Sequence, residues 1–238
     1  MEWISDPNAW VALLTLCLLE IVLGIDNIIF ISILSNNLPA SQQKKAVRLG
    51  LSLALIMRTL MLLSISWIMG LTEPFFTILN KGFSGRDIIL LLGGLFLIYK
   101  SVKEIHQKID LKENEEADMK AKVVSFQSVI LQIVLIDLIF SLDSVITAVG
   151  MVDQVMIMIM AVIFSIGVMM FMAIPISDFV NKHPAIKILA LAFLVMIGTA
   201  LIAEGMGFHI PKGYIYSSLA FALVIEFINI KASSRQSI

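Results

Sequence analysis

Apolar runs long enough to cross a lipid bilayer occupy most of this sequence. A helix needs roughly 20 mainly apolar residues to span the hydrocarbon core. With 59% hydrophobic and only 15% charged residues, the 238-residue chain has too little polar surface for a soluble domain. The sequence therefore predicts a multi-pass protein of the lipid bilayer. The candidate spans are approximately residues 10–35, 46–70, 87–104, 124–151, 155–177, 185–206 and 213–230.

The spans are expected to be helices. Only helices and closed barrels satisfy every backbone polar group inside hydrocarbon, and these runs are too long and too evenly apolar for the alternating strands of a barrel. We therefore expect an all-α membrane protein with seven transmembrane helices. The third is the weakest, because its uncharged core extends only from Ile88 to Tyr99. Acidic residues Glu2 and Asp6 precede the first run, so it is not expected to be a cleaved signal peptide.

Lysine and arginine are distributed unevenly among the loops, and this predicts the orientation. With the N-terminus outside and the C-terminus in the cytoplasm, the outer segments contain only Lys81, Arg86 and Lys212, and Arg58 lies inside a span. The cytoplasmic segments then contain the other 13 of the 17 basic residues: Lys44, Lys45, Arg48, Lys100, Lys103, Lys108, Lys112, Lys120, Lys122, Lys182, Lys187, Lys231 and Arg235.

A sequence pattern in the first span recurs in the fourth. An acid, five intervening residues, a second acid and a small polar residue occur in Glu20–Asn27 and again in Asp137–Ser144, at an offset of 117 residues. Unrelated apolar helices rarely share two acids at one spacing, so the pattern indicates a duplication. Because each copy contains three spans, an odd number, the second copy must enter the membrane in the opposite direction. Inverted repeats of this kind are typical of secondary transporters.

The repeat divides the chain into four segments. We expect a first three-helix repeat at 1–104, a charged cytoplasmic linker at 105–123, a second, inverted three-helix repeat at 124–207, and an additional seventh helix with a C-terminal tail at 208–238. The linker contains the only long mixture of acidic and basic residues, which is typical of a solvated connection.

Four carboxylates at the depth of the bilayer interior need a compensating reason, because each costs several kcal/mol there. A purely structural role would be hydrogen bonding between helices or pairing with Arg58, the one arginine within a span. One arginine can neutralise one carboxylate, so the others must hold protons or a cation. Oxygen ligands alone favour a hard divalent ion such as Mg²⁺, Ca²⁺ or Mn²⁺. The candidate metal ligands are Glu20, Asp26, Asn27, Asp137, Asp143 and Ser144.

The spacing within each pair adds a constraint. Residues six apart on a regular helix point about 120° away from each other, so the two acids would converge only if the helix were broken between them. Gly24 and Ser141 are candidates for such breaks. Arg58 and Glu226 are further candidates for a supporting position around the site or for a proton path.

No soluble-enzyme signature is present in the sequence. It lacks a phosphate-binding glycine loop, a nucleophile elbow and a His-Glu-x-x-His motif. We therefore expect no enzymatic activity, no cofactor other than the transported ion, and no nucleic-acid partner. A homo-oligomer is left open.

The motifs at Glu20–Asn27 and Asp137–Ser144 resemble those of the TerC family of bacterial inner-membrane proteins, which is named for tellurium resistance. The opening Asp6–Trp10 and the stretch Phe140–Gly150 strengthen the resemblance. It covers nearly the whole chain and is greatest to the short members without an added cytoplasmic domain. The family belongs to a larger group that includes the lysine exporters. The resemblance implies a bacterial cytoplasmic-membrane protein associated with Mn²⁺ efflux, with the six candidate ligands lining the ion site.

These observations lead to one main hypothesis and one alternative. The chain is expected to be an inner-membrane secondary transporter that exports a divalent metal ion, with Mn²⁺ favoured and proton exchange as a candidate coupling. The alternative is a non-transporting membrane scaffold or metal-delivery partner in metal homeostasis or tellurium resistance, in which the acids form a static site.

Overall fold

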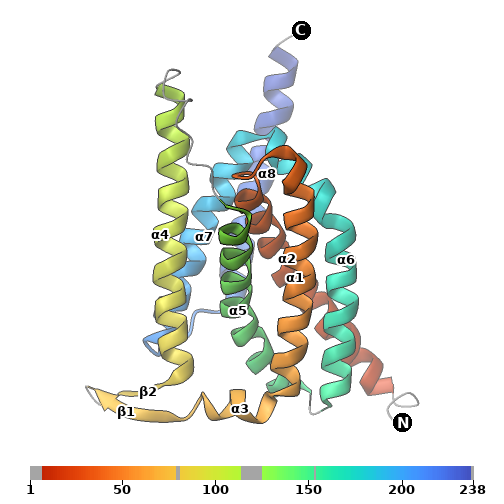
Figure 1. Ribbon diagram of the computed structural model, residues 1–238, viewed down its shortest axis with the longest axis vertical. Coiled ribbons are helices and arrows are strands. Elements are labelled where there is room, and N and C mark those ends of the chain that lie inside the picture. Colours follow the sequence, from red (N-terminus) through yellow and green to blue (C-terminus); the bar gives the residue numbers. More distant parts are fainter. Residues whose placement is uncertain (1–6, 79–80, 114–124, 153, 237–238) are drawn as a thin grey trace. The chain divides into compact units, whose positions relative to one another are not determined.

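The computed structural model describes residues 7–78, 81–113, 125–152 and 154–236, which are mostly helical (Figure 1). The elements are α1 (Pro7–Ser35), α2 (Ala40–Leu63), α3 (Ile65–Gly70), β1 (Pro74–Ile78), β2 (Lys81–Ser84), α4 (Gly85–Glu113), α5 (Phe126–Met151), α6 (Val155–Lys182), α7 (Pro184–Gly205) and α8 (Lys212–Gln236).

Within the described residues, six helices are long and apolar enough to cross a membrane, namely α1, α2, α5, α6, α7 and α8. The remaining expected crossing, 87–104, lies in α4, which has the same 29-residue length as α1. Arg86, Asp87 and Lys100 limit its apolar core. The described chain is thus mostly helical with six clear candidate membrane spans, and α4 is a long helix with a shorter apolar centre.

Two segments differ from the expected spans. The second expected span, 46–70, is interrupted at Ser64, where α2 ends and the short α3 begins. An antiparallel hairpin then follows, with Thr77 opposite Gly82 and Phe76 opposite Phe83. Its exposed aromatic rings fit the polar–apolar boundary of a membrane. The first part of the expected linker 105–123 is helical, because α4 extends to Glu113; the linker residues 114–123 lie outside the described part.

Local sequence signals explain several helix ends. The Ser125 hydroxyl accepts a hydrogen bond from the Ser128 backbone N–H and so caps the start of α5. Pro184 occupies the first turn of α7, where a missing N–H costs nothing. At the other end of α7, Gly207 adopts a positive φ of 87°, and the N–H groups of Gly207 and Phe208 bond back to Glu204 and Ala203. This arrangement is a Schellman motif, which ends α7 before α8 begins.

The contacts within the chain form two compact units. Unit 1 contains Met1–Arg86 and Lys122–Phe179, and unit 2 contains Asp87–Ala121 and Val180–Ile238. Unit 1 thus holds α1, α2, α3, the hairpin, α5 and most of α6, whereas unit 2 holds most of α4 with α7 and α8. This division cuts across the expected halves, because each unit takes helices from both of them.

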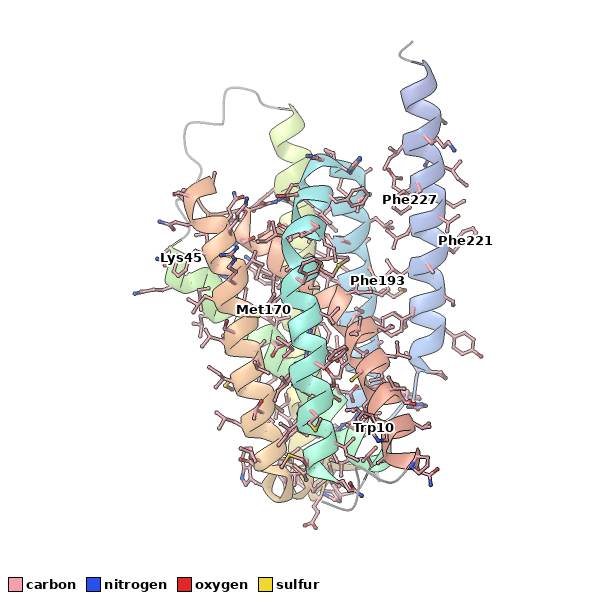
Figure 2. The ribbon with its side chains drawn as sticks, turned by 90° about the vertical axis from the view of Figure 1, so that its right-hand side faces the viewer. Trp10, Lys45, Met170, Phe193, Phe221 and Phe227 are labelled. Atoms are coloured by element: carbon pink, nitrogen blue, oxygen red, sulfur yellow. The ribbon has the colours of Figure 1, made fainter. Side chains whose placement is uncertain are left out.

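In unit 1, α2 packs along α5, and α1 packs against both helices. Gly24 on α1 lies directly against Met169 on α6, so the absence of a side chain at Gly24 allows these helices to approach. Helices α1 and α5 run in opposite directions, and so do α2 and α6 (Figure 1). Lys45, in the first turns of α2, is exposed and projects away from the helices (Figure 2).

In unit 2, α4 and α7 cross at a pair of glycines. A Cβ on Gly94 would meet the Gly198 carbonyl oxygen at 2.5 Å, and a Cβ on Gly198 would meet the Gly94 carbonyl oxygen at 2.8 Å. The contact is reciprocal, because each glycine also faces an isoleucine four residues beyond the other, Ile202 and Ile98. Phe193 of α7 lies 6.3 Å from the Tyr216 ring of α8, whereas Phe221 of α8 is exposed (Figure 2).

Candidate functional site

Arg58 lies between two buried acids at the centre of unit 1. Its Nη1 donates to Glu20 on α1, and its Nε and Nη2 donate to the same Asp137 oxygen on α5 at 3.3 and 3.0 Å. Arg58, Glu20 and Asp137 are only 2%, 4% and 4% exposed. Arginine keeps its proton under practically all conditions. One guanidinium therefore supplies the positive charge for the first acid of both sequence copies.

Polar side chains from both copies surround Asp137. The Asn27 amide nitrogen lies 3.4 Å from Asp137 Oδ1, and the Ser141 hydroxyl donates to Oδ2 at 3.2 Å. The Ser144 hydroxyl donates to the Ser141 carbonyl. Within the described residues, the Asn27 side-chain oxygen is buried without a hydrogen-bond partner. A buried acceptor without a donor is costly, so this oxygen marks a place where a cation or a water would be stabilised.

Asp143, the second acid on α5, pairs with Arg86. The Arg86 Nη2 lies 2.6 Å from Asp143 Oδ1, and the two side chains are 25% and 6% exposed. Arg86 is the second residue of α4 and follows the hairpin directly. The distribution of loop charges placed Arg86 among the outer segments, and no sequence pattern predicted its contact with Asp143. No rule of sequence spacing links positions 86 and 143. The only sequence signal for a role of Arg86 was its position at the end of an expected span.

The structure brings together most of the predicted ligands but not in the expected way. Glu20, Asn27, Asp137 and Ser144 lie in one network around Arg58, whereas the side chain of Asp26 lies outside the described residues. The predicted breaks at Gly24 and Ser141 are absent, because α1 and α5 are continuous helices. The long Arg58 side chain connects the acids across the helices instead. Within the described part, no three His, Cys, Asp or Glu side chains are grouped closely enough to hold a metal ion by themselves.

A small pocket reaches Glu20. It has a volume of about 10 Å³, close to the minimum for one water molecule. Apart from Glu20, its lining is apolar and comes from all four long helices of unit 1. The lining residues are Leu16, Glu20, Leu62, Val145, Ala148, Met158 and Val162.

Glu226, the remaining candidate, lies on α8 in unit 2. The Glu226 side chain is partly exposed, and α8 also carries exposed apolar side chains such as Phe221. The role of Glu226 in a supporting position or a proton path stays a prediction.

Comparisons with known proteins match this chain to integral membrane proteins of one family or to their UPF0053 relatives. A family model described as "Integral membrane protein TerC family" matches residues 5–237. A UPF0053 protein of Haemophilus influenzae is 56% identical over 230 residues, which cover 97% of each chain. The UPF0053 inner membrane protein YgdQ of Escherichia coli is 55% identical over 96% of this chain and 95% of its own. The inner membrane protein YoaE of Escherichia coli is 50% identical, but the match covers only 44% of YoaE. No solved structure gives a significant match.

Proposed function

Because this chain belongs to the TerC family of integral membrane proteins, we propose that it is a secondary transporter that exports a divalent metal ion through the acids of unit 1. Mn²⁺ is the favoured substrate, and proton exchange is the candidate coupling. The observation that carries the proposal is the burial of Glu20, Asp137 and Asp143, each at most 5% exposed, within helices that are apolar enough to span a membrane. Ionisable groups at that depth are costly and commonly mark ion pathways.

The donor set supports a hard cation. Carboxylates, the free Asn27 amide oxygen and serine hydroxyls are all oxygen ligands, and such sets suit Mn²⁺, Mg²⁺ and Ca²⁺. Cys17, the one cysteine of the chain, is buried and its thiol faces the Ala161 carbonyl at 3.9 Å. A soft thiolate ligand is therefore not part of the proposed site.

Arg58 has a defined place in the proposed cycle. Its guanidinium provides a cation between Glu20 and Asp137 when no metal is bound. A divalent ion would replace the guanidinium on at least one carboxylate, with the Asn27 oxygen as an added ligand. Asp26 and Asp143 would supply charge on either side along the helices.

The arrangement of helices supports the inverted repeat on which such a cycle depends. Helices at corresponding positions, α1 with α5 and α2 with α6, run in opposite directions (Figure 1). The reciprocal contact of Gly94 with Gly198 is the kind of contact that a two-fold relation between α4 and α7 produces. In known inverted-repeat transporters, one repeat moves against the other and exposes the ion site to each side of the membrane in turn. The proposed cycle uses the same kind of movement.

Flux in reconstituted vesicles tests the proposal. Purified protein in lipid vesicles should transport Mn²⁺ faster than protein-free vesicles, in a series that also includes Ca²⁺, Mg²⁺, Zn²⁺ and Co²⁺. Asp137→Asn should abolish the flux. Asp178→Asn, which makes the same change at an exposed acid of α6, should not. Equal flux in the wild type and Asp137→Asn would refute the proposed site.

The scaffold alternative has one structural argument in its favour. Arg58 and Arg86 already pair with three buried carboxylates, as a static polar network would require. A scaffold would bind metal or a partner protein without moving ions. Metal binding without flux in vesicles containing only this chain would favour the scaffold.

A further inference from the structure

We propose that Arg86 is a gate for the ion pathway: it closes the pathway while it lies on Asp143 and opens it by swinging away. This inference rests on the transport function proposed above. It concerns the end of unit 1 at which α3 and the hairpin lie, here called the hairpin end (Figure 1). In the predicted orientation the hairpin end faces the outside of the cell.

Asp143 lies on the route from the hairpin end to the central acids. Helix α5 runs toward the hairpin end (Figure 1), and Asp143 is six residues, about 9 Å, beyond Asp137 in that direction. The pocket beside Glu20 is lined in part by Val145 and Ala148, which follow Asp143 along α5 toward the hairpin end. A cation that moves along α5 between the central acids and the hairpin end would therefore pass the level of Asp143.

The ion pair is built asymmetrically. The Asp143 side chain is only 6% exposed, whereas the Arg86 side chain is 25% exposed and lies on the outer side of the pair. Arg86 thus shields a buried carboxylate from solvent. It also places a positive charge in front of the carboxylate, which repels an approaching divalent cation. Both effects keep the pathway closed while the pair is intact.

The backbone of Arg86 is held in place at the start of α4. The Arg86 N–H donates to the Leu71 carbonyl at 3.0 Å, which closes the base of the loop that carries the hairpin. The preceding Gly85 sits against Leu71, where an added Cβ would meet Leu71 Cδ2 at 3.0 Å. An arginine side chain has several rotatable bonds, so in the proposed gate it leaves Asp143 by rotamer changes while the hairpin and the start of α4 stay folded.

Cysteine accessibility tests the gate without requiring metal. In a Cys17→Ala background, Ala148→Cys places a reporter thiol in the pocket wall, where Ala148 is 7% exposed. Membrane-impermeant thiol reagents of positive and of negative charge are applied from each side of the membrane. With Arg86 present, the reporter should react slowly. Arg86→Gln should speed its reaction from the hairpin end by about tenfold or more, because the closed population falls.

The use of reagents with opposite charges distinguishes opening of the pathway from a simple change in the local electrostatic potential. If Arg86→Gln opens the pathway, both reagents react faster; if it only removes a charge, one reacts faster and the other slower. Met151→Cys, at an exposed position near the same end of α5, should react at the same rate with or without Arg86. Arg48→Gln, at an exposed arginine of α2, should leave the reporter rate unchanged.

Asp143→Asn breaks the pair from its other side and covers the case in which Arg86→Gln fails to fold. It should accelerate labelling as Arg86→Gln does, and the double variant should be no faster than either one, because both remove one interaction. Unchanged labelling in Asp143→Asn, or opposite effects on the two reagents, would overturn the gate. If labelling responds as expected while wild-type vesicles show no Mn²⁺ flux, the transport proposal fails and the gate for ions fails with it. Flux with unresponsive labelling rejects the gate alone.

Discussion

Arg58 donates to one oxygen of Asp137 through both Nε and Nη2, at 3.3 and 3.0 Å, although the two residues lie 79 positions apart in the chain. This contact holds α2 against α5, and the third donor of Arg58 connects both helices to Glu20 on α1. A single side chain thus joins three helices at a depth where water is scarce. The stability of unit 1 should depend on it accordingly.

Replacement of Arg58 should show this dependence. Arg58→Met leaves two buried carboxylates without their positive partner, and breaking a buried ion pair from one side costs about 3–5 kcal/mol. Arg58→Lys keeps the charge but not the three-way geometry, so it should retain partial activity. Thermal unfolding in detergent measures both effects, and Arg48→Met at an exposed site of α2 is the control. Wild-type stability in Arg58→Met would contradict the charge-compensating role.

The second acids of the two copies should act together on metal. Asp26→Asn and Asp143→Asn each remove one charge with little change of shape, and each should lower Mn²⁺ affinity by orders of magnitude while the fold is retained. Residues that share one site should be strongly non-additive in the double variant. Calorimetric titration of purified protein with Mn²⁺ gives the affinities. Simple additivity would mean two independent sites.

The glycine crossing of α4 and α7 should tolerate no methyl group. Gly94→Ala and Gly198→Ala each drive a Cβ into the carbonyl oxygen of the other glycine, at 2.5 and 2.8 Å. Overpacking of this kind typically costs about 1–3 kcal/mol. The control is Gly167→Ala in α6, where nothing lies within 4 Å of the added Cβ. Its effect should be neutral or stabilising, because alanine favours a helix by up to about 1 kcal/mol over glycine. Equal melting temperatures for Gly94→Ala and Gly167→Ala would show that the crossing is loose.

The orientation predicted from the loop charges is open to a direct test. Asn37 follows α1 and Thr77 lies in β1, and both are exposed. Single cysteines at these two positions, in a Cys17→Ala background, should label from opposite sides of the membrane. Thr77→Cys should react in intact cells whose outer membrane has been permeabilised, and Asn37→Cys only in inverted vesicles. Labelling of Thr77→Cys from the cytoplasmic side would reverse the orientation.

The positions of the long helices could be predicted from the sequence, because an apolar run is visible in consecutive residues without knowledge of the fold. The expected spans 10–35 and 185–206 agree closely with α1 (Pro7–Ser35) and α7 (Pro184–Gly205). Hydropathy did not predict the break at Ser64 or the hairpin beyond it, because the short segment around Phe75, Phe76 and Ile78 is apolar without being long enough to cross a bilayer. Length and composition therefore located the long helices, and only the structure showed how their connections fold.

The sequence by itself determined that this is a helical membrane protein with two matching pairs of acids, because burial in hydrocarbon makes each charged residue in an apolar run conspicuous. It also singled out Arg58. Only the tertiary structure decided that Arg58 serves Glu20 and Asp137 together, that α1 and α5 stay unbroken, and that Arg86 lies on Asp143. Long side chains reach across helices that meet through packing. No spacing along the chain encodes such a meeting, so these pairings belong to the folded protein alone.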